Sequence, residues 1–146
     1  MTQEILIASD HAGFELKKNL IAAMPDIKWK DLGTRDTSSV DYPDYADALS
    51  VKINKDPSMR GILICGSGQG MCMRANKYPN VRAALGYNEE IVRLSREHND
   101  ANILCLGGRF ISTELALKLL RIFFITHFVG GRHESRVEKI KAPLKP

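Results

Sequence analysis

The amino-acid sequence predicts an α/β fold, in which a doubly wound, five-stranded parallel sheet carries helices on both of its faces. Short apolar runs of strand length recur about five times, and amphipathic segments with helical spacing separate them. Such alternation implies right-handed crossovers between parallel strands. Several of the runs are continuously apolar, which is typical of strands buried on both faces. A chain of 146 residues is long enough for one such domain.

The predicted strands are residues 4–8, 27–32, 61–65, 81–85 and 103–106. Between the first two, Leu16, Leu20 and Met24 recur at four-residue spacing, which predicts a helix. Helix-start signals stand before three further segments: Pro43 with Asp44, Asn88 with Glu89, and Ser112 with Glu114. No linker or repeat divides the chain, so residues 1–146 are predicted to form one domain.

Composition and charge exclude several other classes. Hydrophobic residues make up 44% and charged residues 26% of the chain, values that argue against disordered, collagenous and coiled-coil proteins. The three cysteines show no C-x-x-C spacing, and neither an export signal nor an uninterrupted apolar span is visible. We therefore expect a cytoplasmic protein that does not enter a membrane.

The C-terminal segment 132–146 is basic, because it holds five basic and two acidic residues. Acidic and apolar residues interrupt the basic ones, which favours a helix that presents a few arginines over an unstructured nucleic-acid arm. The basic residues are also not interleaved with exposed aromatic residues, so we expect no nucleic-acid partner.

Ligands of doubly wound folds bind outside the carboxyl ends of the strands, so the residues that follow each apolar run are the first candidates for a site. The loop CGSGQG, residues 65–70, follows one strand and opens a predicted helix. Its backbone N–H groups would converge on one spot and form an anion hole. The loop matches neither a Walker A loop nor G-x-G-x-x-G, and the glycines could instead serve only a tight turn.

Three side chains near this loop could act on a substrate. Cys65 lies beside a predicted helix N-terminus, which favours a thiolate that could act as base or nucleophile, although a buried structural cysteine fits as well. Ser67 could bond a developing oxyanion or merely cap the helix. His98 either continues the apolar stripe of Ile91 and Leu94 as a core histidine or serves as an acid–base group.

Four further residues could bind a phosphate, namely His11, Arg109, Arg132 and Arg136. The two tail arginines are four residues apart and so share one helical face, although each arginine could simply be solvated. Asp10 ends the first strand and could cap the following turn. The four histidines lack a ligand spacing such as H-x-x-x-H, so we expect no metal site.

Six blocks occur in an order and spacing that resemble the type B ribose-5-phosphate isomerases. They are SDHAGF, DYPDYA, ILICGSGQGM, ANKYPNVRAAL, SREHNDANILCLGGR and GGRHESRVEKI. The blocks extend from Ile5 to Ile140, and they are also similar to a wider family that includes the galactose-6-phosphate isomerase subunits.

The resemblance implies interconversion of ribose 5-phosphate and ribulose 5-phosphate through a cis-enediolate, without metal or cofactor, in the non-oxidative pentose phosphate pathway. It also implies a Rossmann-like homodimer whose active sites lie between subunits, with segment 132–146 contacting the partner; whether dimers pair into tetramers stays open. By this resemblance Cys65 is the proton-shuttling base, Ser67 and the amides of Gly66, Gly68 and Gly70 stabilise the enediolate, and His98 opens the ring. The implied substrate contacts are Asp10, His11, Tyr42, Asn99, Arg109, Arg132 and Arg136.

Two positions depart from the family pattern. Arg74 stands where relatives usually have a small residue, and it could either lower the pKa of Cys65 or point into solvent. Ser67 stands where many relatives have threonine, which keeps the hydroxyl. The alternatives to a ribose-phosphate enzyme are an isomerase of allose or galactose 6-phosphate and a non-enzymatic doubly wound module, such as a phosphoacceptor receiver.

Overall fold

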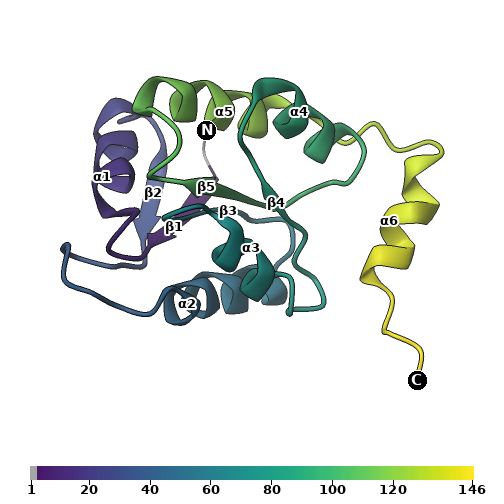
Figure 1. The fold of residues 1–146 in the computed structure, drawn as a ribbon. Helices are drawn as coiled ribbons and strands as arrows, with labels where there is room; N and C mark the ends of the chain where they lie inside the picture. The colour runs from purple at the N-terminus through teal and green to yellow at the C-terminus, as the bar shows by residue number, and fades with distance from the viewer. Residues whose placement is uncertain (1–2) are drawn as a thin grey trace.

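The computed structural model describes residues 3–146 and contains the predicted sheet of five strands, which pair in parallel in the order β2-β1-β3-β5-β4 (Figure 1). The strands are β1 (Glu4–Ser9), β2 (Lys28–Asp31), β3 (Arg60–Cys65), β4 (Ala83–Leu85) and β5 (Ile103–Gly107). The helices are α1 (Phe14–Ala23), α2 (Tyr42–Lys55), α3 (Gln69–Ala75), α4 (Glu89–Glu97), α5 (Thr113–Ile125) and α6 (His133–Lys141).

Helices cover both faces of the sheet, as the sequence predicts. Figure 1 shows α1, α4 and α5 on one face, with α2 and α3 on the other. Residues 61–65 of β3 and all of β5 are buried, which explains why their sequences are continuously apolar. The edge strands β2 and β4 are shorter than predicted, and β2 alternates between exposed and half-buried residues because successive side chains point to opposite faces of the sheet.

Two predicted helix starts are confirmed by side-chain caps. The Ile91 N–H donates to Asn88 Oδ1 at 2.8 Å, and the Leu115 N–H donates to Ser112 Oγ at 3.1 Å. Each bond satisfies one of the backbone donors that a helix leaves unpaired in its first turn. Helix α2 begins at Tyr42 and carries Pro43 in its first turn, where a missing N–H costs nothing.

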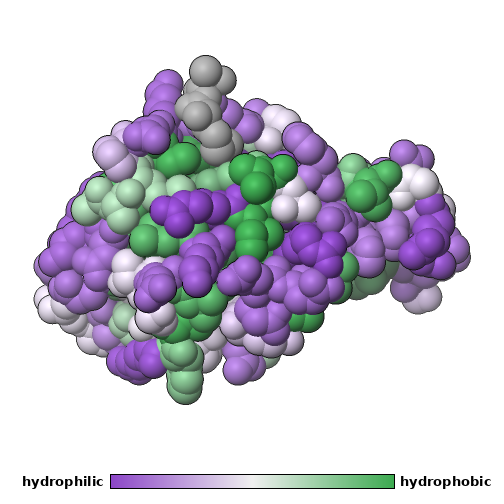
Figure 2. All heavy atoms as spheres, turned by 90° about the horizontal axis from the view of Figure 1, so that it is seen from above, coloured by the Kyte–Doolittle hydropathy of each residue, from purple (hydrophilic) through white to green (hydrophobic). Residues whose placement is uncertain are grey.

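The C-terminal arm, residues 130–146, stands away from the three-layered body and carries α6 (Figure 1). The view from above shows the same projection at the right, beside a body on which apolar and polar side chains are mixed (Figure 2). A cavity of about 750 Å³ separates the arm from the segment around β4, and Ile140 and Leu144 line it from the arm side.

Among the helices within residues 3–146, none has the length and apolar character that crossing a bilayer requires.

One buried charge fastens the loop after β2 to α1. The Lys17 side chain is 1% exposed, and its Nζ donates to Asp31 Oδ1 at 2.7 Å and to the carbonyl of Thr34. Burial lowers the pKa of Lys17, while the Asp31 carboxylate opposes that shift. The ammonium group therefore fixes the path of the chain toward α2.

Arg74 does not point freely into solvent, because it joins α3 to α2. Its Nε donates to Asp47 Oδ1 at 2.7 Å and its second guanidinium nitrogen to Asp47 Oδ2 at 3.1 Å, while the Tyr78 hydroxyl donates to the same carboxylate at 2.9 Å. The hydrogen bond from Arg74 is the main reason that the pKa of Asp47 is lowered. This pairing accounts for the position of the Arg74 side chain without involving Cys65.

Gly68 occupies a position that only glycine fits. Its φ is +81°, and a Cβ there would lie 2.7 Å from Leu85 Cδ1 and 2.9 Å from the carbonyl carbon of Leu106. We expect Gly68→Ala to lower the free energy of unfolding by roughly 1–2 kcal/mol for the left-handed backbone, plus about 1–3 kcal/mol for overpacking. Urea unfolding measures the sum.

Gly131→Ala is the matched control for this substitution. Gly131 also has a positive φ, +57°, but a Cβ there would meet nothing within 4 Å. The control should show the backbone cost alone, and equal losses in the two variants would contradict the steric account.

The Asp47–Arg74 pair should make stability depend on pH in acid. The lowered pKa of Asp47 in the folded state means that its contribution is complete above the ordinary value of 3.8 and is lost as the pH falls through the folded-state value. Arg74→Met should therefore reduce the urea midpoint at pH 7, and the difference from wild type should shrink below pH 4. A difference that stays constant between pH 7 and pH 3 would show that the pair is not its source.

Candidate active site

Three loops meet at the carboxyl edge of the sheet, where β1, β3 and β5 end side by side. The Asp10 N–H donates to the Ile64 carbonyl at 3.1 Å, and the Gly108 N–H donates to the Cys65 carbonyl at 2.8 Å. The Arg109 N–H donates to the Gly66 carbonyl at 3.1 Å. These bonds hold the loop after β3 between the other two and bring the predicted residues of all three loops to one place.

Cys65 lies at the base of the central loop. It is 5% exposed, and the Gly68 N–H donates to its Sγ at 3.2 Å. Ser67, by contrast, is exposed, and the Gln69 N–H reaches its Oγ only at 3.4 Å. The hydroxyl therefore caps α3 weakly and keeps capacity for a ligand.

Tyr42 covers the same loop from the start of α2. Its ring packs against Gly70, where an added Cβ would lie 2.4 Å from Tyr42 Cε1, so a larger residue would displace the ring. Tyr42 is 39% exposed and forms one wall beside the loop.

Asp10 and His11 occupy the loop after β1. Asp10 is 5% exposed, and its Oδ1 accepts a hydrogen bond from the Gly13 N–H at 3.0 Å. The Val40 N–H donates to His11 Nδ1 at 3.2 Å. Because Nδ1 accepts, a neutral His11 carries its proton on Nε2, which can then donate to a ligand.

Arg109 brings a positive charge to this edge. A Cβ built on Gly66 would lie 3.4 Å from a terminal guanidinium nitrogen of Arg109, so the side chain extends along the loop. A fixed cation beside a set of backbone N–H groups favours an anionic ligand.

His98 and Asn99 lie at the opposite edge of the sheet, contrary to the expectation that His98 faces the ligand edge. His98 caps the carboxyl end of α4, and the connection that follows leads into the amino end of β5. At roughly 3.3 Å per residue, the four steps from Ile103 to Gly107 of β5 separate the two edges by roughly 13 Å, and His98 lies a further turn before Ile103. His98 and Cys65 of one chain therefore cannot contact the same small molecule.

His98 is half-buried and does not belong to a core stripe. The buried residues of α4 are Val92, Ser95 and Arg96, whereas Ile91, Leu94 and His98 are only partly covered. The imidazole of His98 instead stacks on that of His133, with ring centroids 4.1 Å apart and an interplanar angle of 13°. The interpretation as a core histidine is thus not supported.

The arm carries the remaining predicted residues. Arg132 precedes α6 and Arg136 lies within it, and both are exposed. His133, which the sequence analysis did not single out, is 9% exposed; burial lowers its pKa, and the nearby charges of His98, Arg132 and Arg136 lower it further. Its four-residue spacing from buried Val137 is the signal that could have placed it on the inner face of α6.

The predicted residues thus form two groups in one chain. Asp10, His11, Tyr42, residues 65–70 and Arg109 gather at the carboxyl edge, while His98, Asn99, Arg132 and Arg136 gather at the amino edge and on the arm. Within residues 3–146, no three His, Cys, Asp or Glu side chains come together in a way that could hold a metal ion.

Comparisons with known proteins find relatives that match nearly the whole chain. Residues 5–140 match the family model described as "Ribose/Galactose Isomerase". The chain is 44% identical over 145 residues to the probable ribose-5-phosphate isomerase B of Mycoplasma pneumoniae, with 97% of this chain and 95% of that protein covered.

Solved structures show the same relationship. A ribose 5-phosphate isomerase from Thermotoga maritima superimposes with a TM-score of 0.93 at 46% identity, covering 97% of this chain and 99% of that one. Ribose-5-phosphate isomerase B from Mycoplasma genitalium, solved with bound ribulose-5-phosphate, gives a TM-score of 0.91 at 41% identity over 97% and 95% of the two chains. The chain therefore belongs to the ribose/galactose isomerase family.

Proposed function

We propose that this protein interconverts ribose 5-phosphate and ribulose 5-phosphate as an aldose–ketose isomerase. The observation that carries the proposal is the carboxyl-edge loop, in which the Cys65 thiol lies beside glycine amides and the exposed Ser67 hydroxyl. The ribulose-5-phosphate bound to the Mycoplasma genitalium relative supports this substrate class. The family description also includes galactose, which makes a six-carbon aldose phosphate the second candidate.

The chemistry needs one base that moves a proton between the first two carbons of the sugar. In the proposed step the Cys65 thiolate removes the proton from C2 of the open-chain aldose, and the C1 carbonyl oxygen takes up negative charge. The same proton returns to C1, while the proton of the O2 hydroxyl passes to O1, so that C2 becomes the carbonyl of the ketose. The N–H groups of the loop and the Ser67 hydroxyl stabilise the intermediate enediolate. Substrate and product have the same composition, so the step consumes no oxidant, and we propose that it needs no metal.

The phosphate and the sugar are bound by residues of both groups. In this proposal His11, Arg109, Arg132 and Arg136 hold the phosphate, Asp10, Tyr42 and Asn99 contact the sugar, and His98 helps to open the furanose ring. Arginine suits the phosphate because its planar fork can donate two hydrogen bonds to neighbouring oxygens.

A homodimer would bring the two groups together. The edges of one sheet lie too far apart for a single sugar phosphate, and the arm stands off the body with an apolar groove beneath it. We propose that the groove and arm, including segment 132–146, receive a second copy of the chain, so that His98, Asn99, Arg132 and Arg136 of one copy complete the carboxyl-edge site of the other. A two-fold pair builds two such sites.

The first test of this function is an assay on the purified protein with EDTA present. Ribose 5-phosphate, allose 6-phosphate and galactose 6-phosphate are supplied separately, and ketose formation is followed. We expect turnover of the five-carbon sugar that chelation does not reduce. Preference for a six-carbon sugar would replace the substrate and keep the chemistry, while inactivity on all three would contradict the proposal.

Cys65→Ala tests the base. We expect turnover to fall by about 10²–10⁴-fold, the range for loss of a positioned acid–base group, because no proton acceptor remains beside C2. Binding of ribose 5-phosphate, measured by calorimetry, should change little, since the phosphate contacts remain. Activity near the wild-type level would assign the proton transfer to another residue.

His98→Asn tests ring opening. Ribulose 5-phosphate cannot close a furanose ring, because its C5 oxygen carries the phosphate, so the ketose does not need this step. At saturating substrate, initial rates from ribose 5-phosphate should fall by about 10²-fold, and those from ribulose 5-phosphate by less than about tenfold. Equal losses in the two directions would contradict the ring-opening role.

A further inference from the structure

The turn that carries His98 and Asn99 ends in an unusual residue. Asp100 has a φ of +50° and is the only non-glycine residue with a positive φ between residues 3 and 146. Its N–H donates to the Arg96 carbonyl at 3.2 Å and ends α4 in a left-handed residue, where glycine is most common. An aspartate in this conformation indicates that its side chain serves a purpose that glycine would not.

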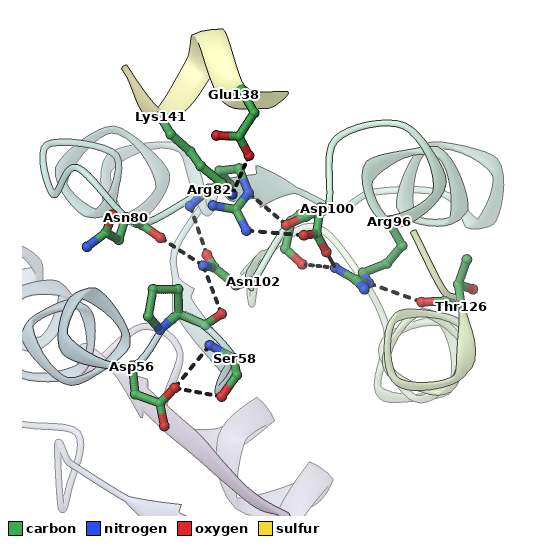
Figure 3. Close-up of polar contacts among 12 residues, drawn as sticks. Asp56, Ser58, Asn80, Arg82, Arg96, Asp100, Asn102, Thr126, Glu138 and Lys141 are labelled. Atoms are coloured by element: carbon green, nitrogen blue, oxygen red, sulfur yellow. Dashed lines mark hydrogen bonds and ion pairs between the residues drawn. The ribbon is translucent and has the colours of Figure 1, made fainter. Parts of the chain in front are cut away.

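The Asp100 carboxylate lies between two arginines (Figure 3). Its Oδ1 accepts a hydrogen bond from Arg96 at 2.8 Å, and its Oδ2 lies 3.5 Å from a terminal nitrogen of Arg82. Arg82 Nε also donates to the Asp100 carbonyl at 2.9 Å. Side chain and backbone of this one residue are therefore both held.

The arginines are themselves fixed to rigid parts of the fold. Arg96 is 2% exposed, and it donates to the Thr126 carbonyl after α5 at 3.1 Å and to the Ala101 carbonyl at 2.6 Å. Arg82 is 8% exposed, and its N–H donates to Asn102 Oδ1 at 2.8 Å, directly before β5 (Figure 3). The carboxylate thus connects the turn to β4, β5 and the end of α5.

The Asp100 carboxylate is the negative charge in a cluster of three arginines. Arg60 is the third guanidinium here; burial lowers its pKa to about 10, and the positive charges of Arg96 and Arg82 contribute. Within residues 3–146, Asp100 is the only carboxylate within ion-pair distance of Arg82 or Arg96. Without it, two buried cations would repel each other and keep only backbone carbonyls as acceptors.

We propose that Asp100, held by Arg82 and Arg96, is the positioning residue that fixes the direction of His98 and Asn99 for catalysis. The inference rests on the proposed function, because it assigns a support to the ring-opening histidine. Asp100 precedes β5 by only three residues, so the carboxylate sets the path of the turn, while the stacked ring of His133 limits the imidazole from the other side. Asp100 itself touches no substrate in this account.

Asp100→Gly separates the carboxylate from the backbone turn. Glycine adopts a positive φ without strain, so the turn can persist while the arginine contacts are lost. Because a displacement of about 1 Å can cost up to 10²-fold in rate, we expect the rate from saturating ribose 5-phosphate to fall at least about fivefold more than the rate from saturating ribulose 5-phosphate. Asp100→Asn, which keeps one acceptor oxygen for Arg96, should show a smaller imbalance in the same sense and serves if the glycine variant does not fold.

Asp47→Asn is the matched control. Asp47 is also an arginine-paired aspartate, although both of its oxygens accept from the single residue Arg74, and its side chain is 32% exposed, as is that of Asp100. Its loss should leave the ratio of the two rates unchanged, since any unfolding lowers both equally. The ratio of the rates from ribose 5-phosphate and ribulose 5-phosphate decides between the two roles. If this ratio changes in His98→Asn but not in the folded Asp100 variants, only the positioning role is overturned. Absence of the imbalance in His98→Asn as well would overturn both this inference and the ring-opening proposal.

Discussion

The parallel arrangement of the sheet decides where every functional side chain of this protein can lie. The helical connections between successive strands send all five strands in one direction, so the loops after β1, β3 and β5 meet at one edge and the carboxyl ends of the helices between the strands lie at the other. Cys65 and His98 are thereby assigned to opposite edges. The proposed shared active site follows from this constraint, because no local change of the chain could bring the two side chains together.

The two edges are built by different physical means. At the carboxyl edge, backbone passes so close to backbone and side chain that Gly68 and Gly70 have no room for a Cβ. At the amino edge, the chain is held by ion pairs between the Asp100 carboxylate and the buried guanidinium groups of Arg82 and Arg96. The carboxyl edge therefore provides backbone N–H groups and the Cys65 thiol, whereas the amino edge provides the side chains of His98 and Asn99.

The sequence predicted the strands, the caps at Asn88 and Ser112, and the gathering of Cys65, Asp10 and Arg109, because periodicity and strand ends are local properties. The interpretation of His98 as an acid–base group at the ligand edge is wrong for a single chain, because α4 carries this residue to the amino end of β5. The burial of Lys17, the pairing of Arg74 with Asp47 and the stack of His98 on His133 depend on contacts between distant segments. Such contacts leave no periodic signal in the sequence.

The claim that two copies share each active site is tested most directly by mixing two inactive variants. Cys65→Ala and His98→Asn chains are unfolded together, refolded at equal concentration and assayed with ribose 5-phosphate. If His98 acts on the Cys65 loop of its partner, half of the dimers are mixed and hold one intact site each, which restores about a quarter of the wild-type activity. Activity no higher than that of the separate variants would show that each chain supplies both residues to its own site.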